Sequence, residues 1–266
     1  MRIARWMPTA FLTLAALACS DGGGGVGLAF STRGIGAAAL AQAGDSTVVV
    51  RGNDTLIIRS VDVVLREIEL KRVEELEENC PDSVADDDDA CEEVSVGIQL
   101  VGLPLGNQTE RVISVNLPAG LYDELEFEIH KPDQLRDAAF IAANPAFANA
   151  SIRVTGTLSR AGTRSDFVFT SDLNEDQEVE LDPPLDVAAD GAVNVTIRLD
   201  VGTWFLSGGG GLVDPATANK GGPNENLVRD NIERSIEAFH DDDHDGLDDD
   251  SGEDDDHGSS HDGPGV

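Results

Sequence analysis

The stretch LPAGLYDELEFEIH, residues 117–130, joins a tight turn to a strictly alternating segment. Pro118, Ala119 and Gly120 suit a turn, because proline fixes its own backbone and glycine tolerates conformations closed to other residues. After the turn, apolar and polar residues alternate, and a period of two gives a strand one buried and one exposed face. The apolar members are Leu125, Phe127 and Ile129, and the polar members are Glu124, Glu126, Glu128 and His130.

The same alternation returns along most of the chain. It is clear at 193–199, where four apolar residues alternate with polar ones, and turn-forming residues at 52–54 and 161–163 separate such segments. About seven to nine strands predict an all-β domain, most simply an antiparallel β-sandwich of the Ig-like or prealbumin-like kind. The other predicted strands are 48–50, 56–70, 112–117, 152–158, 166–170 and 178–181.

Three segments depart from simple alternation. Residues 65–78 can be drawn as helix or strand, and we expect a strand with a bulge at Val63–Val64. The Ala- and Phe-rich residues 134–148 predict a short helical excursion between strands. A C-terminal amphipathic helix is expected at 224–239, after Pro223. Its apolar stripe, at helical spacing, is Val228, Ile232, Ile236 and Phe239.

The N-terminal segment has the pattern of a bacterial lipoprotein signal. Residues 1–18 carry two arginines, an apolar run too short to span a bilayer, and small residues before Cys19. We expect cleavage there and lipidation of Cys19, which would anchor the protein to a membrane outside the cytosol. Residues 19–26 then form a glycine-rich leash, 27–239 the β-sandwich domain with its helix, and 240–266 a disordered acidic tail.

The charge of the chain restricts its partners. The formal net charge is -33, and removal of residues 1–18 takes away two arginines and no acid, which gives -35. Nucleic acid and anionic lipid headgroups are recognised by lysine and arginine, so a polyanion of this kind makes them poor partners. Divalent cations or basic surfaces are the expected counterparts.

The two remaining cysteines, Cys80 and Cys91, flank a polar loop that contains four adjacent aspartates. An oxidising compartment favours a disulfide between them, which would stabilise the fold by roughly 3 kcal/mol. The alternative is a metal-binding cysteine pair, but no second Cys or His pair lies at zinc spacing.

The acidic tail contains the pattern DDDHDGLDD at 241–249. Carboxylates at positions 1, 3, 5 and 9 with glycine at 6 resemble the calcium loops of EF-hand-like and thrombospondin-type repeats. Position 12 is Gly252 instead of a bidentate Glu. The alternatives are a solvated polyanion without a specific site, or loose transition-metal capture by the tail histidines. The calcium ligands implied by the resemblance are the side chains of Asp241, Asp243, Asp245 and Asp249 and the carbonyl of Leu247.

Two further sites can be drawn from the sequence. An envelope enzyme would use Glu126, Glu128 and His130, although an outward face relieved by Arg153 and Arg198 explains the same row. No nucleophile elbow, zinc-protease motif or phosphate-binding loop occurs, so we expect no enzyme. A carbohydrate-binding or adhesion module would need its amphipathic aromatic residues at the surface. These are Tyr122 and Trp204.

Residues 117–127 resemble the hallmark segment of an uncharacterised domain family of secreted bacterial and archaeal lipoproteins, in which an Ala-Gly-x-Tyr turn joins two strands. The stretch SVDVVLREIEL, residues 60–70, is similar to the family's early strand pair, so the likeness covers roughly 45–200. Such turns recur in prealbumin-like and carboxypeptidase-regulatory-like sandwiches. The resemblance implies a β-sandwich and no known activity.

Together these features predict a non-enzymatic, lipid-anchored binding or structural module of the bacterial cell envelope, with an unknown protein or glycan partner. Ser20 follows the lipidated cysteine, which by resemblance to envelope sorting signals favours the outer membrane.

Overall fold

A computed structural model describes residues 23–32, 41–42, 45–73, 93–106, 109–188, 192–241 and 243. This part of the chain is mostly β, with two sheets and two short α-helices, α1 (Ala138–Ala143) and α2 (Glu225–Glu233). No helix in it is long and apolar enough to cross a membrane. The strands are β1 Gly23–Ser31, β2 Ala41–Gln42, β3 Thr47–Arg51, β4 Asp54–Arg72, β5 Glu93–Val96, β6 Gln99–Gly102, β7 Thr109–Pro118, β8 Gly120–Ile129, β9 Ile152–Arg160, β10 Thr163–Ser171, β11 Glu175–Val187, β12 Ala192–Leu199 and β13 Ile236–His240.

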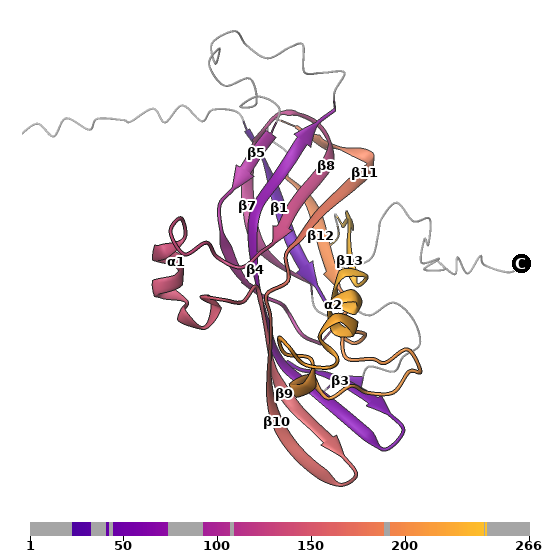
Figure 1. The fold of residues 1–266 in the computed structure, drawn as a ribbon. Coiled ribbons are helices and arrows are strands. Elements are labelled where there is room, and N and C mark those ends of the chain that lie inside the picture. Colours follow the sequence, from indigo (N-terminus) through magenta and orange to yellow (C-terminus); the bar gives the residue numbers. More distant parts are fainter. Residues whose placement is uncertain are drawn as a thin grey trace, which may run out of the picture.

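β4 is the central strand of the larger sheet and runs almost the full height of the molecule (Figure 1). Its first half pairs with β3 and β9, and its second half pairs with β5, β6 and β8. Along its 19 residues, the face of the strand that lies against the core changes twice. The buried positions are even-numbered at Leu56 and Ile58, odd-numbered at Val61, Val63 and Leu65, and even-numbered again at Ile68 and Leu70. Val64 and Arg66, on the other face, are buried as well.

Two bulges in β4 cause these changes, since one extra residue moves every later side chain to the opposite face. The register with β9 shifts between Ile58 and Ser60, and the register with β8 shifts between Arg66 and Glu69. Glu67 has φ of 47° at the second bulge. The prediction of a strand here is confirmed, but the predicted bulge at Val63–Val64 is wrong, because both residues are paired with regular register.

β8 and β9 form one interrupted strand along β4. Ile129 pairs with Leu65 and Ile152 with Val63, although 22 residues separate the two isoleucines in the chain. The intervening segment leaves the sheet and returns to it. It carries α1 and a 3-10 turn at Pro145–Phe147 and projects to the left in Figure 1. The predicted helical excursion is therefore confirmed.

The smaller sheet has the order β13-β12-β1-β7. β1 is parallel to β12 and antiparallel to β7, so this sheet is mixed and not antiparallel as predicted. Residues 26–32 are all buried, as expected for a central strand beside a parallel neighbour. Residues 23–26 belong to this strand, so the glycine-rich segment from Gly23 onward is not the free leash that we expected.

The predicted C-terminal helix is wrong beyond Glu233. The chain turns at Ser235, whose hydroxyl donates to Ile232 O and accepts from Trp204 Nε1, each at 2.7 Å. Residues 236–240 then pair with the edge of β12. The hydrogen bonds that residues 236–240 gain along the free edge of β12 favour a strand more than the spacing of Ile236 and Phe239 favours a helix.

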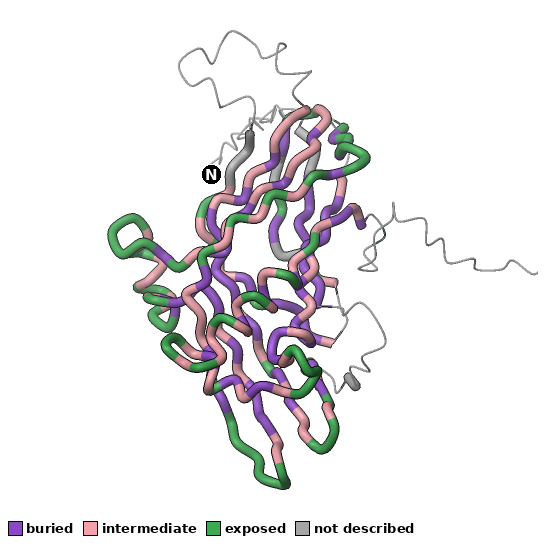
Figure 2. Tube along the Cα trace, turned by 45° about the vertical axis from the view of Figure 1, so that its right-hand side comes forward, coloured by how far each residue is buried: buried purple, intermediate pink, exposed green. Residues whose placement is uncertain are grey.

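A hydrophobic core runs through both sheets and under α2 (Figure 2). At the β9–β10 end of the larger sheet, the segment between β12 and α2 packs over the sheet. Phe205 packs edge-on against Phe167 and Phe169, with ring centroids 6.0 and 5.2 Å apart. Val228 and Ile232 close this layer from α2. On β4, β8 and β11, the face turned away from the core carries polar side chains.

Candidate functional site

Three neighbouring strands carry a row of acidic side chains on the face away from the core. On β8 the alternation places Leu125, Phe127 and Ile129 inside, which confirms the prediction, and turns the glutamates outward. β4 and β11 flank β8 on its two sides and contribute acidic residues to the same face. We call this surface the acidic strip, which consists of Glu67, Glu69, Glu124, Glu126, Glu128, Asp176, Glu178 and Glu180.

Like charges stand directly opposite one another in the strip. Glu126 pairs with Glu69 on β4 and with Glu178 on β11. Glu128 is likewise opposite Asp176, and Glu124 opposite Glu180. Such like-charge pairs destabilise a sheet. Oxygen atoms of Glu124, Glu126 and Glu178 all lie within 4.8 Å of one another.

Lys71 forms ion pairs with two of these carboxylates. Its Nζ lies 2.6 Å from Glu124 Oε1 and 2.5 Å from Glu126 Oε1. The hydrogen bonds to Glu124 and Glu126 raise the pKa of Lys71, so the ammonium stays charged. A cation from this chain therefore already occupies part of the carboxylate cluster.

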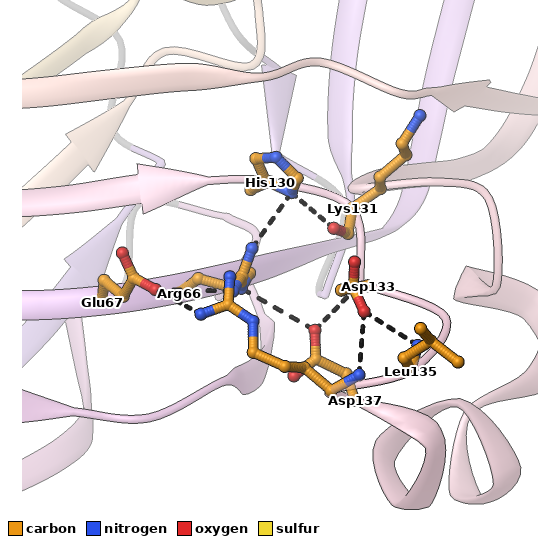
Figure 3. Close-up of polar contacts among 8 residues, drawn as sticks. Arg66, Glu67, His130, Lys131, Asp133, Leu135 and Asp137 are labelled. Atoms are coloured by element: carbon orange, nitrogen blue, oxygen red, sulfur yellow. Dashed lines mark hydrogen bonds and ion pairs between the residues drawn. The ribbon is translucent and has the colours of Figure 1, made fainter.

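The second cation of the face, Arg66, is almost completely buried at the second bulge of β4. Figure 3 shows it at the base of the excursion. Its guanidinium makes ion pairs of 3.4 Å with Glu67 and 3.8 Å with Asp137, and Nη1 lies 3.4 Å from His130 Nδ1. Arg66 thus connects the strip to the segment before α1.

Beside this cluster lies a pocket of about 300 Å³. Burial raises the pKa of Glu128, and the carboxylates of Glu67 and Asp176 raise it further, against the opposing effect of Arg66 and His130. The pocket thus presents closely spaced acidic groups to solvent. Its walls are Glu67, Glu69, Glu126, Phe127, Glu128, Asp176, Gln177 and Glu178.

His130, which follows β8 directly, lies close enough to Glu128 to lower the pKa of that carboxyl, but its hydrogen bonds are with other groups. His130 Nδ1 lies 2.5 Å from the carbonyl oxygen of Lys131, and within the described residues no hydrogen bond joins His130 to Glu126 or Glu128. The two arginines that we expected to relieve the repulsion among these glutamates make other contacts. Arg198 pairs with Glu237 and lies over Phe239, and Arg153 stands opposite Asp62 on β4.

Lys71 and Arg66 were not predicted as part of this site, because a bulge changes the face of the sheet on which the following residues lie. The sequence offers one signal for Lys71: it continues the alternation Ile68, Glu69, Leu70 and so belongs on the polar side. The pairing of β8 with β11 left no local signal, since it joins segments about 50 residues apart.

The other predicted sites have mixed outcomes. Asp241, the first expected calcium ligand, is fully buried, and its Oδ2 accepts a 2.6 Å hydrogen bond from Thr196 Oγ1. Asp243 is exposed. Tyr122 and Trp204 are both buried, so neither is the surface platform that a carbohydrate module would need. The other predicted site residues, Cys19, Cys80, Cys91, Asp245, Leu247 and Asp249, lie outside the described residues.

Comparison of the chain with protein-family models, curated proteins and solved structures finds no match. The resemblance of residues 45–200 to a lipoprotein domain family stays a prediction from the residues quoted above.

Proposed function

We propose that this chain is a lipid-anchored, non-enzymatic module of the bacterial cell envelope that binds a basic partner through the acidic strip. In this proposal Cys19 carries the lipid, and the two sheets form an Ig-like or prealbumin-like β-sandwich. The partner presents lysine or arginine side chains along an extended surface.

The observation that supports this proposal is the arrangement of Glu69, Glu126 and Glu178 directly opposite one another on three strands. Like charges directly opposite one another lower the stability of a sheet, and departures from local rules are expected at functional sites. A cationic partner would remove the repulsion, so its binding would be coupled to a gain in stability.

Lys71 supplies a template for how the strip would hold a partner. One ammonium is shared by the carboxylates of Glu124 and Glu126. The pair Glu128 and Asp176 offers the same cross-strand geometry farther along β8. Its nearest arginine, Arg66, is buried and committed to Glu67 and Asp137.

A basic partner agrees with the geometry better than a tightly bound metal ion does. Of the three glutamates whose oxygens converge, Glu124 and Glu126 already share the ammonium of Lys71, so a metal would have to displace that ammonium. A partner with several cations can instead use the carboxylates along β11 and β4. The calcium loop of the tail is not needed for this proposal.

Binding of a decalysine peptide to the full mature chain, measured by calorimetry at low salt, tests the strip. We expect Glu126→Gln with Glu178→Gln to weaken binding at least tenfold, and added salt to weaken it in the wild type. The matched control is Asp166→Asn with Asp230→Asn, which removes the same charge from exposed sites on β10 and α2. Equal losses in both double variants would mean that only the net charge matters.

The anchor is tested separately by mass spectrometry of the mature N-terminus and by flotation with lipid vesicles. The proposal expects an acylated Cys19 and a protein that floats, whereas Cys19→Ala should not float. An unmodified, non-floating wild-type protein overturns the anchoring half of the proposal and leaves the strip test intact.

A further inference from the structure

β1 enters the fold immediately after the expected lipidation site. Gly23 pairs with Pro118 and Gly24 with Leu117, so the backbone is fixed in the smaller sheet from residue 23 onward. Only residues 20–22 lie between Cys19 and this strand, which makes four residue steps from Cys19 to Gly23.

That separation limits how far the fold can lie from a membrane. Four residues span at most about 14 Å even when fully extended. Gly23 and the turn beside it, Pro118–Gly120, must therefore stay close to the lipid headgroups if Cys19 carries the anchor. A free leash through residue 26 would have allowed roughly twice that reach.

The end of the domain that contains this turn carries an arginine. Arg72 Nη2 donates a 3.0 Å hydrogen bond to Ala119 O, and its guanidinium lies 5.5 Å from the centre of the Tyr122 ring. Pro118 and Ala119 are exposed. A cation and an exposed apolar turn thus lie at the tethered end, where residues 74–92, which contain ten acids, also connect β4 to β5.

We infer that the Pro118–Gly120 turn and Arg72 rest on the lipid headgroups, and that β4 stands away from the membrane plane. This inference rests on the anchoring proposed above. Lying flat on the β4–β8–β11 face would press the acidic strip against anionic lipid, which electrostatic repulsion opposes. Standing upright leaves the strip accessible to a partner from the side.

The opposite end of the molecule provides an internal reference. The β9–β10 hairpin closes at Arg160 and Thr163 and points away from the β7–β8 turn in Figure 1. Ser159 pairs with Thr55 near the start of β4, and Tyr122 pairs with Arg72 at its end. A strand of this length places the two ends roughly 50 Å apart.

Energy transfer from a genetically encoded fluorescent amino acid to headgroup-labelled lipid tests the orientation. The residue replaces either Ala119 or Thr163, both exposed, in the full mature protein on vesicles of phosphatidylethanolamine and phosphatidylglycerol. We expect strong transfer from position 119 and little from position 163. Ten Gly/Ser residues inserted between Asp21 and Gly22 should reduce the transfer from position 119.

Equal transfer from the two positions, or stronger transfer from position 163, overturns the upright orientation while the protein still floats with vesicles. Transfer from position 119 that does not change with the inserted linker overturns the role of the short tether. If the wild-type protein fails to float, as expected only for Cys19→Ala, the anchoring proposal itself fails and this inference fails with it.

Discussion

Thr196 Oγ1 donates a 2.6 Å hydrogen bond to Asp241 Oδ2 in a fully buried position at the end of β13. Asp241 N also donates to Asn194 O at 3.3 Å, which continues the pairing of β13 with β12 by one residue. A residue that the sequence assigned to an acidic tail is thus part of the folded domain.

Thr196→Val should lower the free energy of unfolding by about 2 kcal/mol, because it keeps the shape of the side chain and removes a hydrogen bond to a charged group. Urea denaturation measures the loss. Hydrogen exchange should increase over 236–241 before other segments respond. Thr163→Val, at an exposed site, should change stability by less than about 0.5 kcal/mol. Equal effects of the two variants would show that the Thr196 hydroxyl contributes nothing specific.

Lys71→Met should destabilise the domain by roughly 0.5–1 kcal/mol at low salt, since the partly exposed ammonium no longer lies between Glu124 and Glu126. The effect should shrink in 1 M salt, and adding Glu126→Gln should recover part of it. Chemical denaturation of the single and double variants at both salt concentrations measures this coupling. Strict additivity of the two substitutions would contradict it.

The stability of the strip should depend on pH through Glu128. Its pKa is raised above 4.5 in the folded protein, first by burial and then by Glu67 and Asp176. The folded state therefore binds this proton more tightly than the unfolded chain, and its contribution to stability is lost as the pH rises above 4.5 through the folded pKa.

Glu128→Gln should then be more stable than wild type at pH 7, with an advantage that disappears below pH 4.5. Thermal unfolding across this range measures the difference. Asp230→Asn, at an exposed site on α2, should show no comparable trend. A Glu128→Gln protein that is less stable at pH 7 would mean that Arg66 stabilises the carboxylate more than burial penalises it.

The β9–β10 turn contains an alanine with φ of 50° followed by Gly162 with φ of 79°. Two consecutive left-handed residues suit a hairpin, and Asn-Gly is the preferred pair. Ala161→Asn should therefore stabilise the domain by about 0.5–1 kcal/mol, whereas Ala161→Val, which is β-branched, should destabilise it by more than about 1 kcal/mol. The two variants having the same sign in urea denaturation would contradict this prediction.

The alternation in the sequence correctly predicted the strands whose two faces differ, of which β8 is the clearest example. It failed for β1, because Gly23 to Gly25 look like a linker when read locally. Pairing with β7 nevertheless holds all three glycines in the strand, and Gly25 also pairs with β12. It failed for β13, where the spacing of Ile236 and Phe239 fits a helix until the free edge of β12 is considered.

The candidate site was predictable only in part for a related reason. The glutamates of β8 follow from local alternation, but the like-charge pairs depend on the register of β8 with β4 and β11. That register depends on the bulge at Glu67, and neither local propensity nor periodicity locates a bulge. The sequence therefore did not show Arg66 as a partner of these glutamates, and for Lys71 it indicated only the polar side of the strand.

The contact between Arg66 and Asp137 provides a last prediction, because it fastens the excursion to β4. Asp137 Oδ2 lies 3.8 Å from Arg66 Nε and accepts a 2.7 Å hydrogen bond from Asp133 N. Asp137→Asn leaves the buried guanidinium with Glu67 as its remaining ion-pair partner among the described residues. The change should lower stability by about 1–3 kcal/mol, as expected when a buried charge loses a partner.

Hydrogen exchange should localise that effect. Residues 133–148 should exchange faster in Asp137→Asn, while β4 and β8 keep their protection, because the excursion lies outside the paired strands. Arg136→Met is the matched control, since Arg136 is exposed and its 3.7 Å contact with Glu67 should contribute little. If Arg136→Met opens the excursion as much as Asp137→Asn does, the buried ion pair is not what fastens it.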